Sequence, residues 1–159
     1  MNINVIAIGK LKEKYWKDAI AEYEKRLVPY TKLEILEGPE LSAASEIGEK
    51  ERWQILKKEG LFFSAKIRED DYNIALDMNG SMMTSEELAD IIREQALMKG
   101  KNINFLIGGS LGMDRDIIKK CHRCVAFGRA TFPHQMIRVF LTEQIYRCFK
   151  IIRGEPYHK

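Results

Sequence analysis

Residues 104–112 read Asn-Phe-Leu-Ile-Gly-Gly-Ser-Leu-Gly, an apolar run that ends in a glycine-rich turn. In α/β proteins, ligands bind at such places, at the carboxyl ends of parallel strands. The glycines allow a ligand to approach the backbone closely, although a tight turn alone explains them equally well. The turn lacks both the Gly-x-Gly-x-x-Gly spacing of dinucleotide-binding folds and the Gly-Lys-Ser/Thr of a P-loop. Neither NAD nor a nucleoside triphosphate is therefore favoured.

Short apolar segments alternate with segments of helical periodicity on both sides of this stretch. The predicted strands are 3–8, 33–36, 72–76, 104–107 and 124–127. Several of them are too apolar to have one face in water, as expected for a parallel sheet that is covered on both sides. The pattern predicts an α/β fold, with a mainly parallel sheet and helices on both faces. Because no linker or repeat interrupts it, we expect a single domain over residues 1–159.

Four helices are predicted, three between these strands and one after the last strand. The first covers 12–26 and ends before Pro29, and a second lies somewhere within 43–66. A third covers 85–99, because Thr84 and Glu87 have capping-box spacing and Gly100 supplies a stop. The last begins at Pro133, a residue suited to the first helical position, and ends near residue 152.

The composition of the 159 residues, 45% hydrophobic and 31% charged, is typical of a soluble globular protein. The net charge of +3 is too small to indicate a nucleic-acid partner. However, residues 113–159 hold 10 Lys and Arg against 4 Asp and Glu, so the basic excess lies at the C-terminal end. With three cysteines, no signal peptide and no membrane span, we expect reduced thiols, a cytoplasmic location and no membrane partner.

Three further features are ambiguous on the residues alone. Asp77, after a predicted strand, could orient a ligand, but a local turn hydrogen bond is the better interpretation. The Cys-His-Arg-Cys stretch at 121–124 lacks further metal ligands and does not open a helix, so neither a metal nor a redox site is predicted. The last helix opens with His134, where backbone amides could meet an anionic group.

Several of these segments together resemble a known family. They are Ala75-Leu76-Asp77 with Gly80, Phe105 to Gly109 with Gly112, Thr131 to Gln135 with Arg138, Glu143 to Arg147, and Pro156-Tyr157-His158. The chain resembles the RlmH family of ribosomal RNA large-subunit methyltransferases, in the SPOUT superfamily. The resemblance covers the whole sequence. It implies a trefoil-knotted α/β fold, a homodimer, and methylation of N3 of a pseudouridine in 23S ribosomal RNA within the assembled ribosome.

The resemblance also implies which residues bind the methyl donor, S-adenosylmethionine. They are Leu76, Gly108, Phe127, Gly128, Arg129, Ala130, Thr131 and Phe132. Residues 126–130 read Ala-Phe-Gly-Arg-Ala where we expect a serine-containing pattern, so backbone contacts are expected there.

Methyl transfer to N3 requires removal of its proton. The candidate groups are His134, and Tyr157 with His158 on a tail that could cover its own pocket or that of a partner subunit. Arg138, Arg147 and Arg153 are candidates for RNA contacts or for salt bridges in the dimer. Two other classes of function remain open. One is an enzyme with a different nucleotide cofactor, and the other is a noncatalytic ribosome-binding module.

Overall fold

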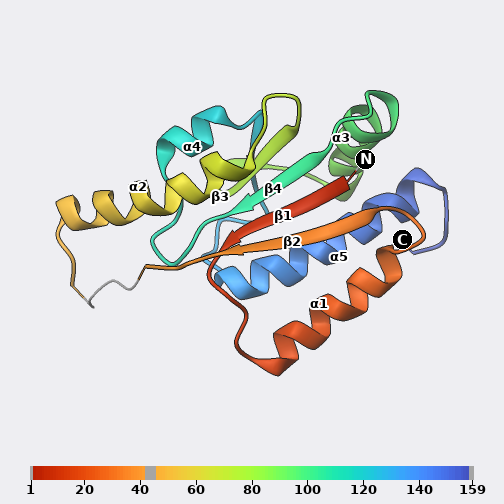
Figure 1. Ribbon diagram of the computed structural model, residues 1–159. Helices are drawn as coiled ribbons and strands as arrows, with labels where there is room; N and C mark the ends of the chain where they lie inside the picture. Colours follow the sequence, from red (N-terminus) through yellow and green to blue (C-terminus); the bar gives the residue numbers. More distant parts are fainter. Residues whose placement is uncertain (1, 42–45, 158–159) are drawn as a thin grey trace.

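The computed structural model describes residues 2–41 and 46–157, which form one sheet with helices packed on it (Figure 1). The elements are β1 (Asn2–Ile8), α1 (Lys14–Leu27), β2 (Lys32–Gly38), α2 (Glu49–Lys66), β3 (Tyr72–Met82), α3 (Ser85–Ile92), the π-helix η1 (Arg93–Met98), β4 (Ile103–Ile107), α4 (Arg115–Lys120), β5 (Arg123–Ala126) and α5 (His134–Ile152). Except for β3, and with α3 and η1 taken together for the helix predicted over 85–99, the strands and helices with predicted bounds begin and end within two residues of them. The short helix α4 had no predicted bounds.

The five strands are all parallel and lie in the order β2-β1-β4-β3-β5. The parallel arrangement brings the ends of β1, β3, β4 and β5 to the same edge of the sheet. The predicted parallel sheet is confirmed.

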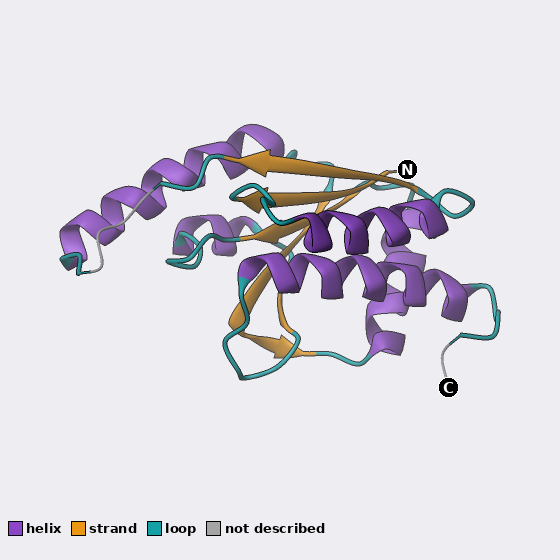
Figure 2. Cartoon of the chain, turned by 90° about the horizontal axis from the view of Figure 1, so that it is seen from below, coloured by secondary structure: helices purple, strands orange, loops and turns teal. Residues whose placement is uncertain are grey.

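Helices cover both faces of this sheet, as predicted. On one face, β1 residues such as Ile3 and Val5 pack with Leu88 of α3 and with Leu141 and Ile145 of α5. The alternate β1 residues, Ile6 and Ile8, pack on the other face with Phe63 of α2 and Ile117 of α4. Figure 2 shows α1 and α5 side by side along the first face. Among the described helices, none is long and apolar enough to cross a membrane.

A buried polar ladder fixes how the three central strands align. Asn104 of β4 is fully buried, accepts a hydrogen bond from Asn4 of β1 (2.7 Å), and donates to Asn73 of β3 (2.8 Å) and to Asp71 (3.1 Å). A shift by one residue would leave these polar groups buried and unpaired, at a cost of several kcal/mol. The ladder therefore holds the carboxyl ends of the strands level with one another.

The helix predicted over 85–99 forms in two parts. The Thr84 side chain accepts from the Glu87 amide, and the Glu87 side chain accepts from the Thr84 amide, so the predicted capping box is confirmed. After Ile92, however, the backbone widens into the π-helix η1 before Gly100, at φ +68°, ends it. Over such a short segment the apolar spacing is compatible with either winding, which is why periodicity did not reveal the change.

The prediction that the third strand ends at residue 76 is wrong. β3 continues to Met82, with a register irregularity between Leu76 and Ser81 where it pairs with β5. Asp77 accepts from the Asn79 amide (2.9 Å), the local hydrogen bond expected of a turn, and it does so inside an irregular strand. A Cβ atom on Gly80 would lie only 2.6 Å from the Val125 nitrogen. The close approach of β3 to β5 therefore requires glycine at this position.

We expect the substitution Gly80→Ala to destabilise the protein by about 2 kcal/mol, because the added methyl group meets backbone that has no flexible end to move. The matched control is Gly48→Ala. Gly48 lies at an ordinary φ of −72°, no atom lies within 4 Å of its Cβ position, and the change should stay within about 0.5 kcal/mol. Urea denaturation measures the free energy of unfolding of both variants. Equal stability of the two variants would mean that the crossing of β3 and β5 tolerates more space than the structure shows.

Candidate functional site

A cavity of about 1300 Å³ opens at the carboxyl edge of the sheet. Its walls are the segments that follow β3, β4 and β5, together with the first residues of α5. Side chains of Leu76, Ile107, Phe127 and Ile137 give it apolar surface, and glycine backbone from residues 108–112 gives it polar groups. Its position and mixed lining are typical of a binding site for a small molecule.

Of the eight predicted cofactor residues, all except Arg129 line this cavity: Leu76, Gly108, Phe127, Gly128, Ala130, Thr131 and Phe132. Arg129 instead donates to the carbonyl oxygens of Met78 (2.7 Å) and Gly80 (2.9 Å). It therefore ties the segment that precedes α5 to the far half of β3, and its contribution to the cavity is to hold one wall in place.

The glycine turn after β4 closes tightly on itself. The Gly112 amide donates to the Gly109 carbonyl (3.0 Å), and Gly112 has a φ of +90°. A Cβ atom on Gly108 would lie 2.3 Å from the Gly112 carbonyl oxygen. Any side chain at Gly108 would force the turn apart, so the sequence requirement at this position is steric.

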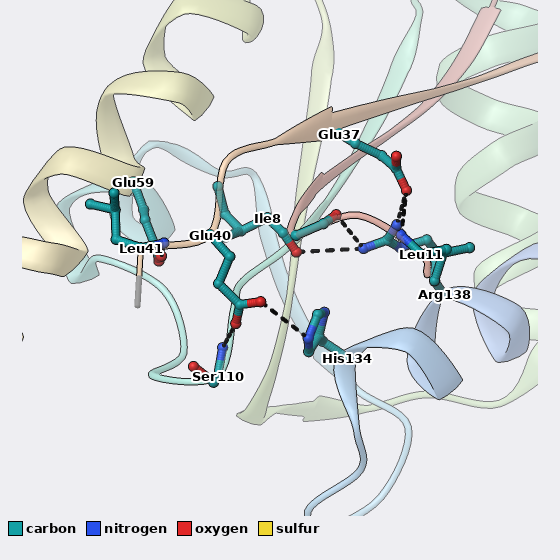
Figure 3. A network of polar contacts seen from close by, with 10 residues as sticks. Ile8, Leu11, Glu37, Glu40, Leu41, Glu59, Ser110, His134 and Arg138 are labelled. Carbon is teal, nitrogen blue, oxygen red and sulfur yellow. Dashed lines mark hydrogen bonds and ion pairs between the residues drawn. The ribbon is translucent and has the colours of Figure 1, made fainter. Parts of the chain in front are cut away.

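His134 lies in the cavity wall, and its ring is held from behind (Figure 3). Nε2 lies 3.7 Å from a carboxylate oxygen of Glu40, and the side chain is only 15% exposed. Nδ1 is buried without a hydrogen-bond partner in the described residues, and it lies 3.5 Å from where a Cβ on Gly9 would be. Burial lowers the pKa of His134, while Glu40 partly opposes that shift. The imidazole is therefore neutral at pH 7.

Arg138, a predicted RNA contact, lies in the interior of the protein with no exposed surface. Its guanidinium bonds to the Glu37 carboxylate (2.6 Å) and to the Gly9 carbonyl (3.0 Å), as Figure 3 shows. Glu37 also accepts from the Leu11 amide (3.1 Å). This arginine ties α5 to the ends of β1 and β2 and is not accessible to RNA in this structure.

The other two predicted RNA arginines lie near the opposite end of α5. Arg147 makes hydrogen bonds of 2.5 Å and 3.0 Å with Glu143. Arg153 is half exposed, donates to the Pro29 carbonyl (3.1 Å), and lies 4.4 Å from the centre of the Tyr30 ring. Neither lines the cavity.

Tyr157 also lies at that end of α5. Its hydroxyl donates to Glu143 (3.1 Å), and the Arg147 guanidinium lies 4.8 Å from its ring centre. Burial and the nearby Glu143 charge raise the pKa of Tyr157 to about 12, so it is a neutral phenol at pH 7. His158 lies outside the described residues. Glu143 is nine residues after His134 on α5, so about 14 Å of helix separates the Tyr157 contact from the cavity wall at His134.

The cysteines provide no reactive group. Burial raises the pKa of Cys121 and of Cys148 to about 12, and it also raises the pKa of Cys124. Within residues 2–41 and 46–157, no three His, Cys, Asp or Glu side chains are grouped closely enough to hold a metal ion.

Sequence reasoning missed one wall of the cavity. Arg52 and Leu56 of α2, and Arg115 and Ile118 of α4, line it on the side away from α5. Arg52 is exposed and donates to the Leu111 carbonyl (3.0 Å), whereas Arg115 is exposed and has no hydrogen bond or ion pair with another described residue. Arg52 lies far along the chain from the basic region 113–159 that the charge distribution indicated, whereas Arg115 lies at the start of that region.

Comparisons with known proteins agree with this architecture. A family model described as "Predicted SPOUT methyltransferase" matches residues 1–158. A probable methylase family protein from Haemophilus influenzae is a structural neighbour with 12% identity and a TM-score of 0.54, over 99% of this chain and 70% of that one. Other neighbours are a methylase family protein from Neisseria gonorrhoeae (14% identity, TM-score 0.56, 92% and 82%) and TrmJ from Zymomonas mobilis (12%, 0.56, 100% and 73%). At these identities the likeness concerns the fold, and the predicted SPOUT-type arrangement is confirmed.

Proposed function

Because the chain belongs to the SPOUT methyltransferase family, we propose that it methylates N3 of a pseudouridine in 23S ribosomal RNA, on the assembled ribosome. Methyltransferases of this family use S-adenosylmethionine, which supplies an electrophilic methyl group on its sulfonium centre. The observation that supports the site is the cavity formed by the three segments that follow β3, β4 and β5. The RNA base and the ribosomal context rest on the resemblance to the RlmH family.

The residues of the cavity fit this cofactor. Leu76, Ile107 and Phe127 offer apolar surface for an adenine ring, while the tight turn at Gly108 leaves the backbone open to polar groups. About 1300 Å³ is more than the several hundred Å³ that one small ligand fills. The cavity therefore has room for a substrate base beside the cofactor, on the side where α2 and α4 form the wall.

The proton on N3 must leave before or during transfer, so a basic group or a water molecule has to accept it. Tyr157 is a poor acceptor because its phenol is already protonated at pH 7. His134 is neutral, but its ring nitrogens lie towards Glu40 and Gly9, behind the cavity wall. We therefore favour His158, with Tyr157 orienting the tail through its hydrogen bond to Glu143.

Tyr157 does not line the cavity of its own chain, since its hydroxyl is held at Glu143, about 14 Å along α5 from His134, and we propose that the tail serves the cavity of a second copy. This geometry supports a homodimer in which each tail covers its partner's site. The apolar side chains of Met78 and Met82 on β3 and of Phe140 on α5 are 47%, 60% and 42% exposed, and an interface between two copies would bury them.

The ribosomal RNA would meet the α2 and α4 wall of the cavity. Arg115 has no ionic partner among residues 2–41 and 46–157, and Arg52 is already oriented by the Leu111 carbonyl. Trp53, next to Arg52, is 60% exposed and could stack on a base. Guanidinium groups bind phosphate in a bidentate way, so we assign the phosphate contacts beside the cavity to Arg52 and Arg115.

The first test is transfer of labelled methyl from S-adenosylmethionine to ribosomes from cells that lack this protein, with naked 23S RNA in parallel. We expect label on N3 of one pseudouridine, mapped by mass spectrometry, and only when ribosomes are supplied. If a folded protein binds ribosomes but transfers no label, it is a binding module instead. Label on naked RNA alone would contradict the assembled substrate.

The second test separates a tail that acts in trans from one that acts in cis. His158→Ala should lose most activity because the proposed proton acceptor is removed. Gly108→Ala should lose activity because the added methyl group distorts the turn that binds the cofactor. Dimers mixed from the two variants contain one site with an intact cavity and an intact tail, so about a quarter of the wild-type activity should return. No recovery on mixing would contradict the shared site, and full activity of His158→Ala alone would remove the tail from catalysis.

The third test concerns the RNA contact. Arg115→Gln should raise KM for ribosomes by about fivefold, because a bidentate phosphate contact is lost, with no change in the Kd for S-adenosylmethionine. The control is Arg93→Gln, since Arg93 is a surface arginine on η1 whose ion pair with Asp90 is exposed. Similar KM values for the two variants would place the RNA elsewhere on the protein.

A further inference from the structure

Glu40 lies just after the edge strand β2 and does not line the cavity, yet its carboxylate contacts two cavity walls. One oxygen accepts from the Ser110 amide in the glycine turn (3.0 Å). The other lies 3.7 Å from Nε2 of His134, the first residue of α5. Figure 3 shows the side chain reaching between these two segments. Ser110 and His134 are 24 positions apart in the sequence, and the single carboxylate joins them.

Two glycines make the space that this carboxylate occupies. A Cβ on Gly109 would lie 3.2 Å from one Glu40 oxygen and 3.0 Å from the Ile8 side chain. A Cβ on Gly9 would lie 3.1 Å from the other oxygen and 2.9 Å from the His134 ring, and Gly9 has a φ of +88°. The ends of β1 and β4 thus both lack a side chain where Glu40 passes, which indicates a built position for this carboxylate.

A buried cation and a second acid lie beside Glu40. Arg138, fully buried on α5, lies close enough to interact with both Glu37 and Glu40. Glu59 of α2 is the neighbouring acid, and it accepts from the Leu41 amide (3.0 Å). Burial raises the pKa of Glu59, and the charge of Glu40 adds to that shift.

We propose that Glu40 is a positioning residue of the cofactor site, which joins the glycine turn at Ser110 to the start of α5 at His134. It sets the separation of the two walls between which S-adenosylmethionine binds, and this inference rests on the proposed function. It does not touch the reacting atoms, so its loss acts on cofactor binding through the two walls. No covalent step is assigned to it.

The experiment compares Glu40→Ala and Glu40→Gln with Glu34→Ala, a control at an exposed acid on the preceding strand β2. Calorimetry measures the Kd for S-adenosylmethionine and for S-adenosylhomocysteine. We expect Glu40→Ala to weaken both by about tenfold, because small displacements of binding groups have large effects. Glu40→Gln keeps an acceptor for the Ser110 amide and should restore most of the affinity. Glu34→Ala should bind as the wild type does, since Glu34 is exposed on β2 and does not line the cavity.

A second readout needs no ligand. The groups that shift the pKa of His134 are its burial, Glu40 and Arg138, and of these only Glu40 raises it. Both Glu40 variants should therefore lower the His134 pKa in an NMR titration, while Glu34→Ala leaves it unchanged. The Ser110 amide should also exchange with solvent faster in Glu40→Ala than in Glu40→Gln. A general loss of stability would not produce this pattern, and Glu40→Gln keeps the test decisive if Glu40→Ala fails to fold.

The outcomes separate this inference from the proposed function. If wild-type protein binds neither S-adenosylmethionine nor S-adenosylhomocysteine, the proposed function fails, and the assignment of Glu40 to this cofactor fails with it. If the wild-type protein binds S-adenosylmethionine and both Glu40 variants bind it with the wild-type Kd, the proposed function stands and Glu40 is not a positioning residue. An unchanged His134 pKa in both variants would also overturn the inference.

Discussion

The arrangement of the site depends on the close approach of β3 to β5 at Gly80. The backbone of Val125 occupies the place where a side chain at Gly80 would be. Arg129 donates hydrogen bonds to the carbonyl oxygens of Met78 and Gly80 in the same part of β3. These contacts hold the segment between β5 and α5 against the far half of β3. They thereby determine where α5 begins, and α5 carries His134 and Arg138 to the ends of β1 and β2. Without the close approach at Gly80, the cavity wall formed by the segment between β5 and α5 would have no fixed place.

The sequence predicted most elements because their signals are local. Strand β4 and the capping box at Thr84 follow from neighbouring residues, and the structure confirms both. The far half of β3 could not be predicted in this way, since Asp77 to Gly80 has the composition of a turn and contains a turn hydrogen bond. Its strand character comes from pairing with β5, which lies more than forty residues further along the chain. The knotted fold likewise came from resemblance to a family, because chain threading leaves no periodic signal.

The positions of the cavity residues were easier to predict from the sequence than the surroundings of the arginines, for a similar reason. Residues such as Gly108 are constrained by their own turn, whereas the environment of an arginine depends on distant segments. Arg138 pairs with Glu37, 101 positions away. A local signal was available, since Arg138 precedes Leu141 and Ile145 at helical spacing, and all three are fully buried. The position of Arg138 on the apolar stripe of α5 indicates an internal ion pair, and this is a stronger signal than the indication of an RNA contact from its charge alone.

Helix α5 thus joins two regions with different requirements. At its start, His134 and Arg138 are buried among Glu37 and Glu40, where fixed charges orient the backbone of a binding cavity. Further along the helix, Tyr157 and Arg147 both contact Glu143, near the middle of α5. The rigid helix therefore holds Tyr157 about 14 Å from His134, outside the cavity of its own chain. The proposed use of the tail at the cavity of a second copy agrees with this separation, because the start of α5 and the Tyr157 contact then contribute to different sites of a dimer.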